Sequence, residues 1–124
     1  MTVVWVDAWQ MQCCGKPFGV GDQVAWTLVD LDTDFAASVV GTAEAAQITH
    51  AEDHHDVSPA DALVTSGTVS RIRAVFCRYV AVDPAGKTLY PAAGSQRIEE
   101  RSSANGWESE TDDMHFISYL VDLV

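Results

Sequence analysis

The chain has 124 residues, of which 48% are hydrophobic and 20% charged, and this composition is that of a single soluble globular domain. Its 18 acidic residues against 7 basic ones give a formal net charge of −11, which argues against nucleic acids and anionic membranes as partners, because both require a cationic surface. No apolar run approaches the ~20 residues that span a bilayer, and the first residues lack the basic segment of a signal peptide. We therefore expect one cytoplasmic domain over residues 1–124.

The first predicted strand covers residues 2–9, which are rich in β-branched and aromatic residues and apolar on both faces. Alternation along this strand places Trp5 and Trp9 on the same face. Residues 13–22 contain glycines and a proline and predict a loop with turns. Residues 23–31 then predict a second strand.

Residues 32–47 are ambiguous: Asp34 could cap a short helix, which Gly41 would interrupt. Residues 48–62 are polar and predict a long surface loop.

The strongest strand signal in the chain runs over residues 63–83, and its length predicts a bulge or bend near Gly67 or Ala74. Residues 83–88 have the proline and glycine of a hairpin turn. Residues 115–124 predict a buried terminal strand, with apolar side chains on both faces.

Five or six strands with bends and glycine-rich turns indicate an all-β fold, which we expect to be a small SH3-like or OB-like β-barrel. One short helix or ordered loop insertion is expected within it. Two short phrases, at residues 20–26 and 66–72, resemble the turn-plus-strand segments of SH3-like barrels.

The chain has three cysteines, and two of them, Cys13 and Cys14, are adjacent. Adjacent cysteines rarely bond each other, and a reducing cytosol keeps thiols reduced, so we expect three free thiols and a tight turn at this pair. Nothing in the sequence resembles a nucleophile elbow, or a helix N-terminus placed to lower the pKa of a cysteine. No dinucleotide or phosphate-binding glycine motif is present. The sequence therefore gives no support for an enzyme.

A metal site is the competing interpretation of the cysteine pair. His50 and His54 have a spacing that suits zinc, and a composite site with the cysteines would hold that metal. The ligands of this zinc site would be Cys13, Cys14, His50 and His54. In the other interpretations the histidine segment is a solvated surface loop, or a loop that responds to pH or contacts a ligand.

Tryptophans and arginines each admit two interpretations as well. The four tryptophans are either core residues or the lining of a pocket at the barrel mouth.

Six of the seven basic residues lie between positions 71 and 101, and Arg71 and Arg73 begin this group. They either form ion pairs within the chain or contact an acidic ligand or a second copy of the chain.

The run Trp-Gln-Met-x-Cys-Cys-Gly-x-Pro-Phe at residues 9–18 is followed by Glu-Asp-His-His at 52–55 and by a basic strand. With these segments the chain resembles a family of small uncharacterised actinobacterial proteins. The resemblance implies a bacterial cytosolic protein. It singles out Trp9, Gln10, Cys13, Cys14, Gly15, Pro17, Phe18, Glu52, Asp53 and His54 as positions that carry the family pattern.

Together these observations predict a non-enzymatic binding module that forms a homodimer or binds another protein or a small ligand. It has no cofactor, unless zinc occupies the composite site. The residues expected to contact a ligand or partner are Trp9, Gln10, Cys13, Cys14, Asp53, His54, Arg71 and Arg73. A third interpretation is an acidic inhibitor or immunity-type protein, whose negative surface covers a basic target.

Overall fold

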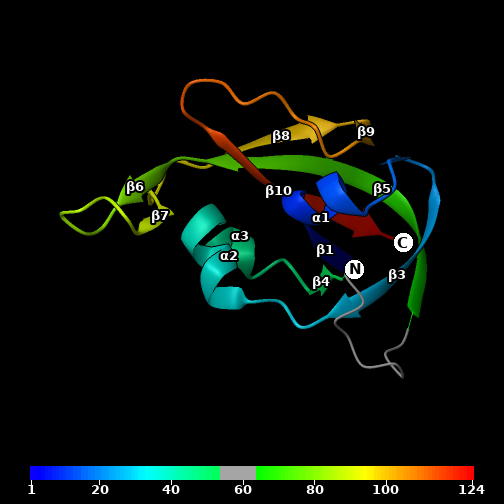
Figure 1. Ribbon diagram of the computed structural model, residues 1–124. Coiled ribbons are helices and arrows are strands. Elements are labelled where there is room, and N and C mark those ends of the chain that lie inside the picture. The colour runs from blue at the N-terminus through cyan, green and yellow to red at the C-terminus, as the bar shows by residue number, and fades with distance from the viewer. Residues whose placement is uncertain (54–63) are drawn as a thin grey trace.

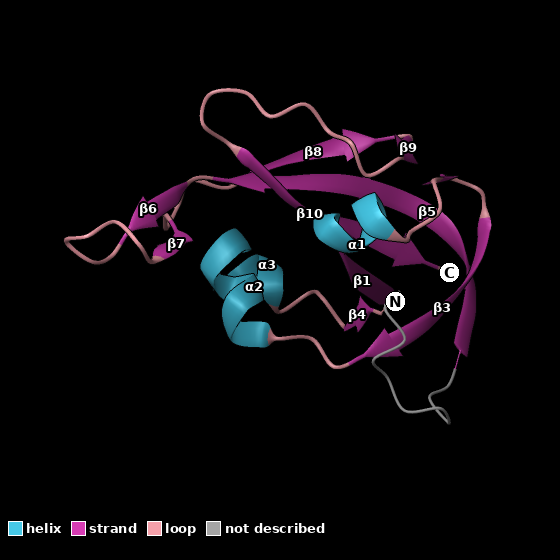
Figure 2. Ribbon diagram, in the orientation of Figure 1, coloured by secondary structure: helices cyan, strands magenta, loops and turns pink. Residues whose placement is uncertain are grey.

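A computed structural model describes residues 1–53 and 64–124, and within these ranges the fold is mainly β. The strands are β1 (Thr2–Asp7), β2 (Phe18–Gly19), β3 (Gln23–Val29), β4 (His50–Glu52), β5 (Val64–Cys77), β6 (Tyr79–Ala81), β7 (Leu89–Pro91), β8 (Arg97–Arg101), β9 (Ser103–Ala104) and β10 (His115–Leu123) (Figure 1). The helices are α1 (Ala8–Cys13), α2 (Thr33–Val40) and α3 (Thr42–Ala45) (Figure 2). Within the described ranges, no helix is long and apolar enough to cross a membrane.

The main sheet has six strands in the order β10-β1-β4-β3-β5-β8. The long strand β5 changes its partner: residues 64–68 pair with β3, and residues from Val69 onward pair with β10. The change comes between Thr68 and Val69, close to Gly67, which is one of the two positions near which the sequence predicts a bulge or bend. The mainly β class is confirmed, but the six strands form a bent sheet and not a clear barrel. Two small sheets, β2-β9 and β6-β7, accompany it.

The predicted first strand is too long, because β1 ends at Asp7 and α1 begins at Ala8. Trp9 therefore lies on a helix and does not share a strand face with Trp5. The carbonyl oxygen of Gln10 accepts hydrogen bonds from the backbone N–H groups of Cys14 and Gly15, each at 2.9 Å. These two bonds end the helix.

Residues 32–47 form two helices, where one short helix or ordered insertion was expected in the whole chain. The capping residue is Asp32 and not Asp34, since a side-chain oxygen of Asp32 accepts the backbone N–H of Phe35 at 3.1 Å. Gly41, with φ of 88°, separates α2 from α3 as expected, because a residue with a side chain rarely adopts that angle.

Strand β10 is buried as predicted, but its side chains do not alternate regularly. A register shift against β5 between Phe116 and Ser118 adds one residue to the strand. Phe116 consequently packs in the same core as Tyr119, and Ile117 packs against the opposite core.

The sheet separates two hydrophobic cores. The first core combines Met11 of α1 with side chains from the strands. Its residues include Val4, Val6, Met11, Phe18, Trp26, Phe76, Phe116 and Tyr119. The second lies beneath α2 and α3 and includes Val3, Trp5, Ala36, Val39, Val40, Ile48, Val75 and Leu120. Helix residues thus pack against both faces of the sheet.

Helix α1 is fastened to the segment after β9 by a chain of hydrogen bonds. The Gln12 amide donates to the carbonyl of Gly106 at 3.0 Å, and the N–H of Gly106 donates to the Tyr119 hydroxyl at 3.1 Å. That hydroxyl donates to Glu108 at 2.7 Å, and Glu108 also accepts from Arg101 at 2.8 Å. This series of hydrogen bonds fixes the position of α1, which borders both of the hollows described next.

Candidate functional site

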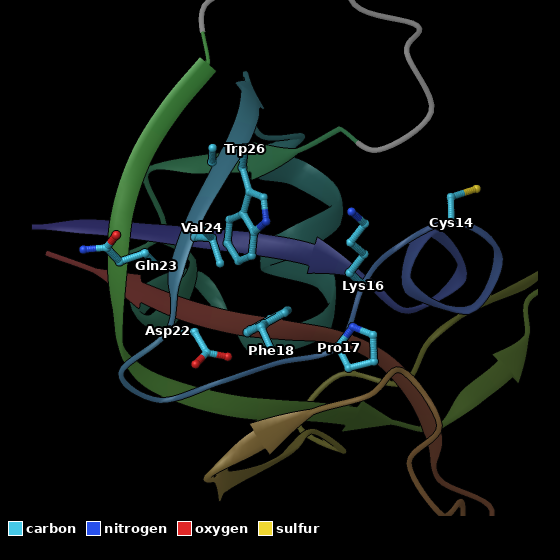
Figure 3. Close-up of a pocket in the computed structure, with 9 residues that line it drawn as sticks. Cys14, Lys16, Pro17, Phe18, Asp22, Gln23, Val24 and Trp26 are labelled. Atoms are coloured by element: carbon cyan, nitrogen blue, oxygen red, sulfur yellow. The ribbon is translucent and has the colours of Figure 1, made fainter.

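A pocket of about 510 Å³ lies between β3 and the segment that follows the cysteine pair. It is lined by Cys14, Lys16, Pro17, Phe18, Asp22, Gln23, Val24, Ala25 and Trp26 (Figure 3). We call it the Trp26 pocket. Its volume lies in the range of about 300–1,000 Å³ that is usual for small-molecule sites.

The floor of the Trp26 pocket is aromatic. Phe18 and Trp26 pack edge to face with their ring centroids 5.1 Å apart, and Phe18 rests in turn on Tyr119 at 6.3 Å. In Figure 3 the Lys16 side chain approaches the Trp26 indole from the opposite wall. Asp22 lies beyond Phe18, where its carboxylate accepts the backbone N–H of Gly19 at 2.7 Å. The pocket thus has an apolar floor between one cation and one anion.

The adjacent cysteines are bonded to each other: Cys13 and Cys14 form a vicinal disulfide at the end of α1. The expectation of three free thiols is therefore wrong for this pair. Both residues are exposed, and the Cys14 side chain points away from Trp26 in Figure 3. The third cysteine, Cys77, is a buried thiol whose pKa is raised to about 11 by burial, so it is not a reactive nucleophile at neutral pH.

A second hollow, of about 350 Å³, lies on the other side of α1. It is lined by Asp7, Ala8, Trp9, Gln12, Phe35, Tyr79, Glu110, Phe116 and Ile117, and we call it the Trp9 groove. Trp9 is 55% exposed and Phe35 is 38% exposed, so both rings are open to a bound group. The groove thus joins residues from α1, α2, β6 and the start of β10.

Two carboxylates border the Trp9 groove. Asp7 accepts the indole N–H of Trp5 at 2.8 Å and the side-chain amide of Gln10 at 3.1 Å, so its position is fixed. Glu110 accepts the backbone N–H of Phe116 at 2.6 Å. A carboxylate has about four lone-pair sites, so each can still accept a hydrogen bond from a bound group.

The segment around β4 is not the solvated loop that the sequence predicts. Glu52 is 3% exposed and Asp53 is 8% exposed, and the backbone N–H of Asp53 donates to Thr27 at 2.9 Å. Burial, reinforced by the nearby charges of Asp53 and Asp7, raises the pKa of Glu52 to about 8. Glu52 is therefore mostly protonated at neutral pH.

The predicted zinc ligands are not assembled in the described part of the chain. The Nδ1 atom of His50 lies 3.0 Å from the Thr49 hydroxyl, and His54 lies outside the described residues. Over residues 1–53 and 64–124, no three side chains of His, Cys, Asp or Glu gather in a way that could hold a metal ion. A disulfide also lacks the thiolates that bind zinc.

Both of the arginines proposed as partner contacts form ion pairs within the chain. Arg73 is 9% exposed, with Glu44 at 2.7 Å and Asp122 at 3.5 Å. Arg71 is exposed and forms a two-pronged contact with Glu100 at 2.6–3.0 Å. These contacts support the interpretation in which the basic residues neutralise acids of the same chain.

Three of the predicted contact residues lie at these hollows. Trp9 lines the Trp9 groove, Gln10 donates to the Asp7 carboxylate of that groove, and Cys14 lies at the edge of the Trp26 pocket. Sequence reasoning did not find the groove residues Phe35, Tyr79 and Glu110. They come from α2, from β6 and from the loop before β10, and no local pattern connects them.

Comparisons with the curated proteins and with the solved structures each found no match. Comparison with protein families matched residues 1–124 to DUF6578, a family of unknown function. The match covers the whole chain, and the family is uncharacterised, as the resemblance implies. The chain therefore belongs to this family of unknown function.

Proposed function

We propose that this protein is a non-enzymatic interaction module that binds a basic protein segment in the Trp9 groove. The observation that carries the proposal is Trp9 itself, a 55% exposed indole beside the carboxylates of Asp7 and Glu110. An aromatic ring and two carboxylates around one hollow are the groups that recognise an arginine or lysine side chain.

In this proposal the cationic end of a partner side chain lies over the rings of Trp9 and Phe35. The ring faces attract the cation, and Asp7 and Glu110 accept its N–H groups. Arginine suits this site better than lysine, because its planar group stacks on a ring and donates to two carboxylates at once.

The charge of the whole chain supports a basic partner. With a formal net charge of −11, the surface attracts a cationic segment over several ångströms and speeds its association, and salt weakens this attraction. The inhibitor-type function rests on the same property, since a negative surface can cover a basic target.

A second copy of the chain also fits this description. The β6–β7 hairpin extends away from the main sheet (Figure 1), and Arg78 is exposed at its base. Insertion of this side chain into the groove of another copy would give the self-association that we propose. A bacterial, cytoplasmic setting, with residues 9–18 as the segment that marks the family, belongs to the same proposal.

The test is calorimetric titration of the full chain with hexa-arginine, hexalysine and hexaglutamate peptides, with light scattering for self-association. We expect hexa-arginine to bind most tightly and hexaglutamate not at all. Glu110→Gln should weaken the binding several-fold. Asp30→Asn removes the same charge away from the groove and should change it little. Equal losses in the two variants would mean that net charge alone attracts the peptide, and would contradict the proposal.

A further inference from the structure

The Trp26 pocket contains a cation that the chain itself does not neutralise. Every arginine donates to an oxygen of the chain: Arg71 to Glu100, Arg73 to Glu44, Arg78 to the carbonyl of Asp112, Arg97 to Glu99 and Arg101 to Glu108. Among the described residues, Lys16 has no ion pair, although the chain has 18 acidic residues.

The position of Lys16 relative to the floor of the pocket defines an orientation for a ligand. The rings of Phe18 and Trp26 offer an apolar surface, and Lys16 faces the indole from the opposite wall (Figure 3). Asp22 is on the far side of Phe18, so an anionic group is attracted to the Lys16 end and repelled from the other.

We propose that the Trp26 pocket binds a small carboxylate with an apolar body, of the arylalkanoate kind. The carboxylate pairs with the Lys16 ammonium, and the apolar body lies on Phe18 and Trp26. A volume of about 510 Å³ accommodates a ligand with one ring and a short chain. This site is separate from the Trp9 groove and does not depend on the function proposed for it.

The experiment is an NMR titration of the full, oxidised chain, observing the indole N–H signals of its four tryptophans. The probes are 3-phenylpropionate, 3-phenylpropanol and 3-phenylpropylamine, which share one body and differ in charge. We expect the carboxylate to shift the Trp26 signal saturably, with the alcohol binding more weakly and the amine weakest.

Lysine occurs only twice in the chain, which provides a matched control. Lys16→Gln should weaken the binding of 3-phenylpropionate about fivefold, as expected for loss of one solvent-accessible ion pair. Lys87→Gln removes the same charge from the exposed turn of the hairpin and should leave the affinity unchanged. Both residues are exposed, so both variants should give the dispersed spectrum of the folded chain.

Four results would overturn the proposal. The first is no saturable shift of Trp26 at millimolar 3-phenylpropionate. The second is equal affinity for the carboxylate and the alcohol, which would make the pocket apolar without preference for an anion. The third is a shift of the Trp9 signal in place of the Trp26 signal. The fourth is an equal loss of affinity in the two lysine variants.

Discussion

Replacement of Glu52 by glutamine should stabilise the protein, and should do so more as the pH rises. The Glu52 side chain is 3% exposed and its pKa is raised to about 8 by burial, with the charges of Asp53 and Asp7 adding to the effect. In the unfolded chain this carboxyl ionises near its ordinary value of 4.5. Between the two values the unfolded state has lost the proton and the folded state retains it.

The sign of the effect follows from proton linkage. A group whose pKa is higher in the folded state binds more protons there, so its contribution to stability falls as the pH rises from 4.5 to about 8. Each pH unit in this window costs at most about 1.4 kcal/mol, which sets a ceiling of about 3 kcal/mol by pH 7. Glutamine is uncharged at every pH and removes this cost.

The assay is urea denaturation of the wild type and of Glu52→Gln at several pH values between 4.5 and 8. The gain in the free energy of unfolding should grow by about 1–3 kcal/mol between pH 4.5 and 7. Asp113→Asn, on an exposed loop, controls for the loss of one negative charge. A difference between wild type and Glu52→Gln that does not change with pH would refute the reasoning.

Three further predictions concern stability. Arg73→Met should lower the free energy of unfolding in urea by about 3 kcal/mol, because it leaves Asp122 buried without its cation. Arg71→Met removes an exposed ion pair and should lower it by less than about 1 kcal/mol. Equal losses in the two variants would contradict this. Tyr119→Phe removes the hydroxyl between Gly106 and Glu108 and should cost about 1–3 kcal/mol by the same assay, and a change near zero would argue against that bridge. Reduction of the Cys13–Cys14 disulfide should lower the melting temperature by less than about 1 °C, because a bond between neighbours constrains the unfolded chain very little; a fall of several degrees in calorimetry would disprove this.

Sequence patterns predict the regular strands well and fail where tertiary contacts decide. Strand β3 lies where alternation places it, and β10 lies where its apolar run places it. Gly86, with φ of 66°, turns the β6–β7 hairpin as its sequence indicates. The strand signal of residues 2–7 continues through Ala8 and Trp9, yet those residues begin a helix. The helix packs closely on the segment after β9, since a Cβ added at Gly106 would lie 2.9 Å from the Cβ of Met11 in α1.

The buried acids of β4 were misread for a similar reason. Glu52 and Asp53 stand in a polar segment, which predicts a loop. Their burial comes from β4 pairing with β1 in parallel and with β3 antiparallel, and these contacts span long stretches of chain. Composition contains no signal for such pairings.

The candidate sites were predictable only in part. The tryptophan interpretation allowed a pocket, and Trp26 lines one, but Trp9 is exposed on a helix and borders a different hollow. Lys16 lies inside the run of residues 9–18 that carried the family resemblance, yet the significance of its charge emerges only when the arginines are seen to be paired. Pairing of this kind is a property of the folded chain.

The most direct test of the proposed interaction is to locate the binding of a basic peptide on the folded protein. The four indole N–H signals report on named places: Trp9 on the groove, Trp5 on the Asp7 carboxylate of the same groove, Trp26 on the pocket, and Trp107 on the loop before β10. On titration with hexa-arginine, we expect a saturable shift of the Trp9 signal that weakens in high salt and in Glu110→Gln. A Trp9 signal that stays in place while the others move, or while the peptide binds by calorimetry, would contradict it.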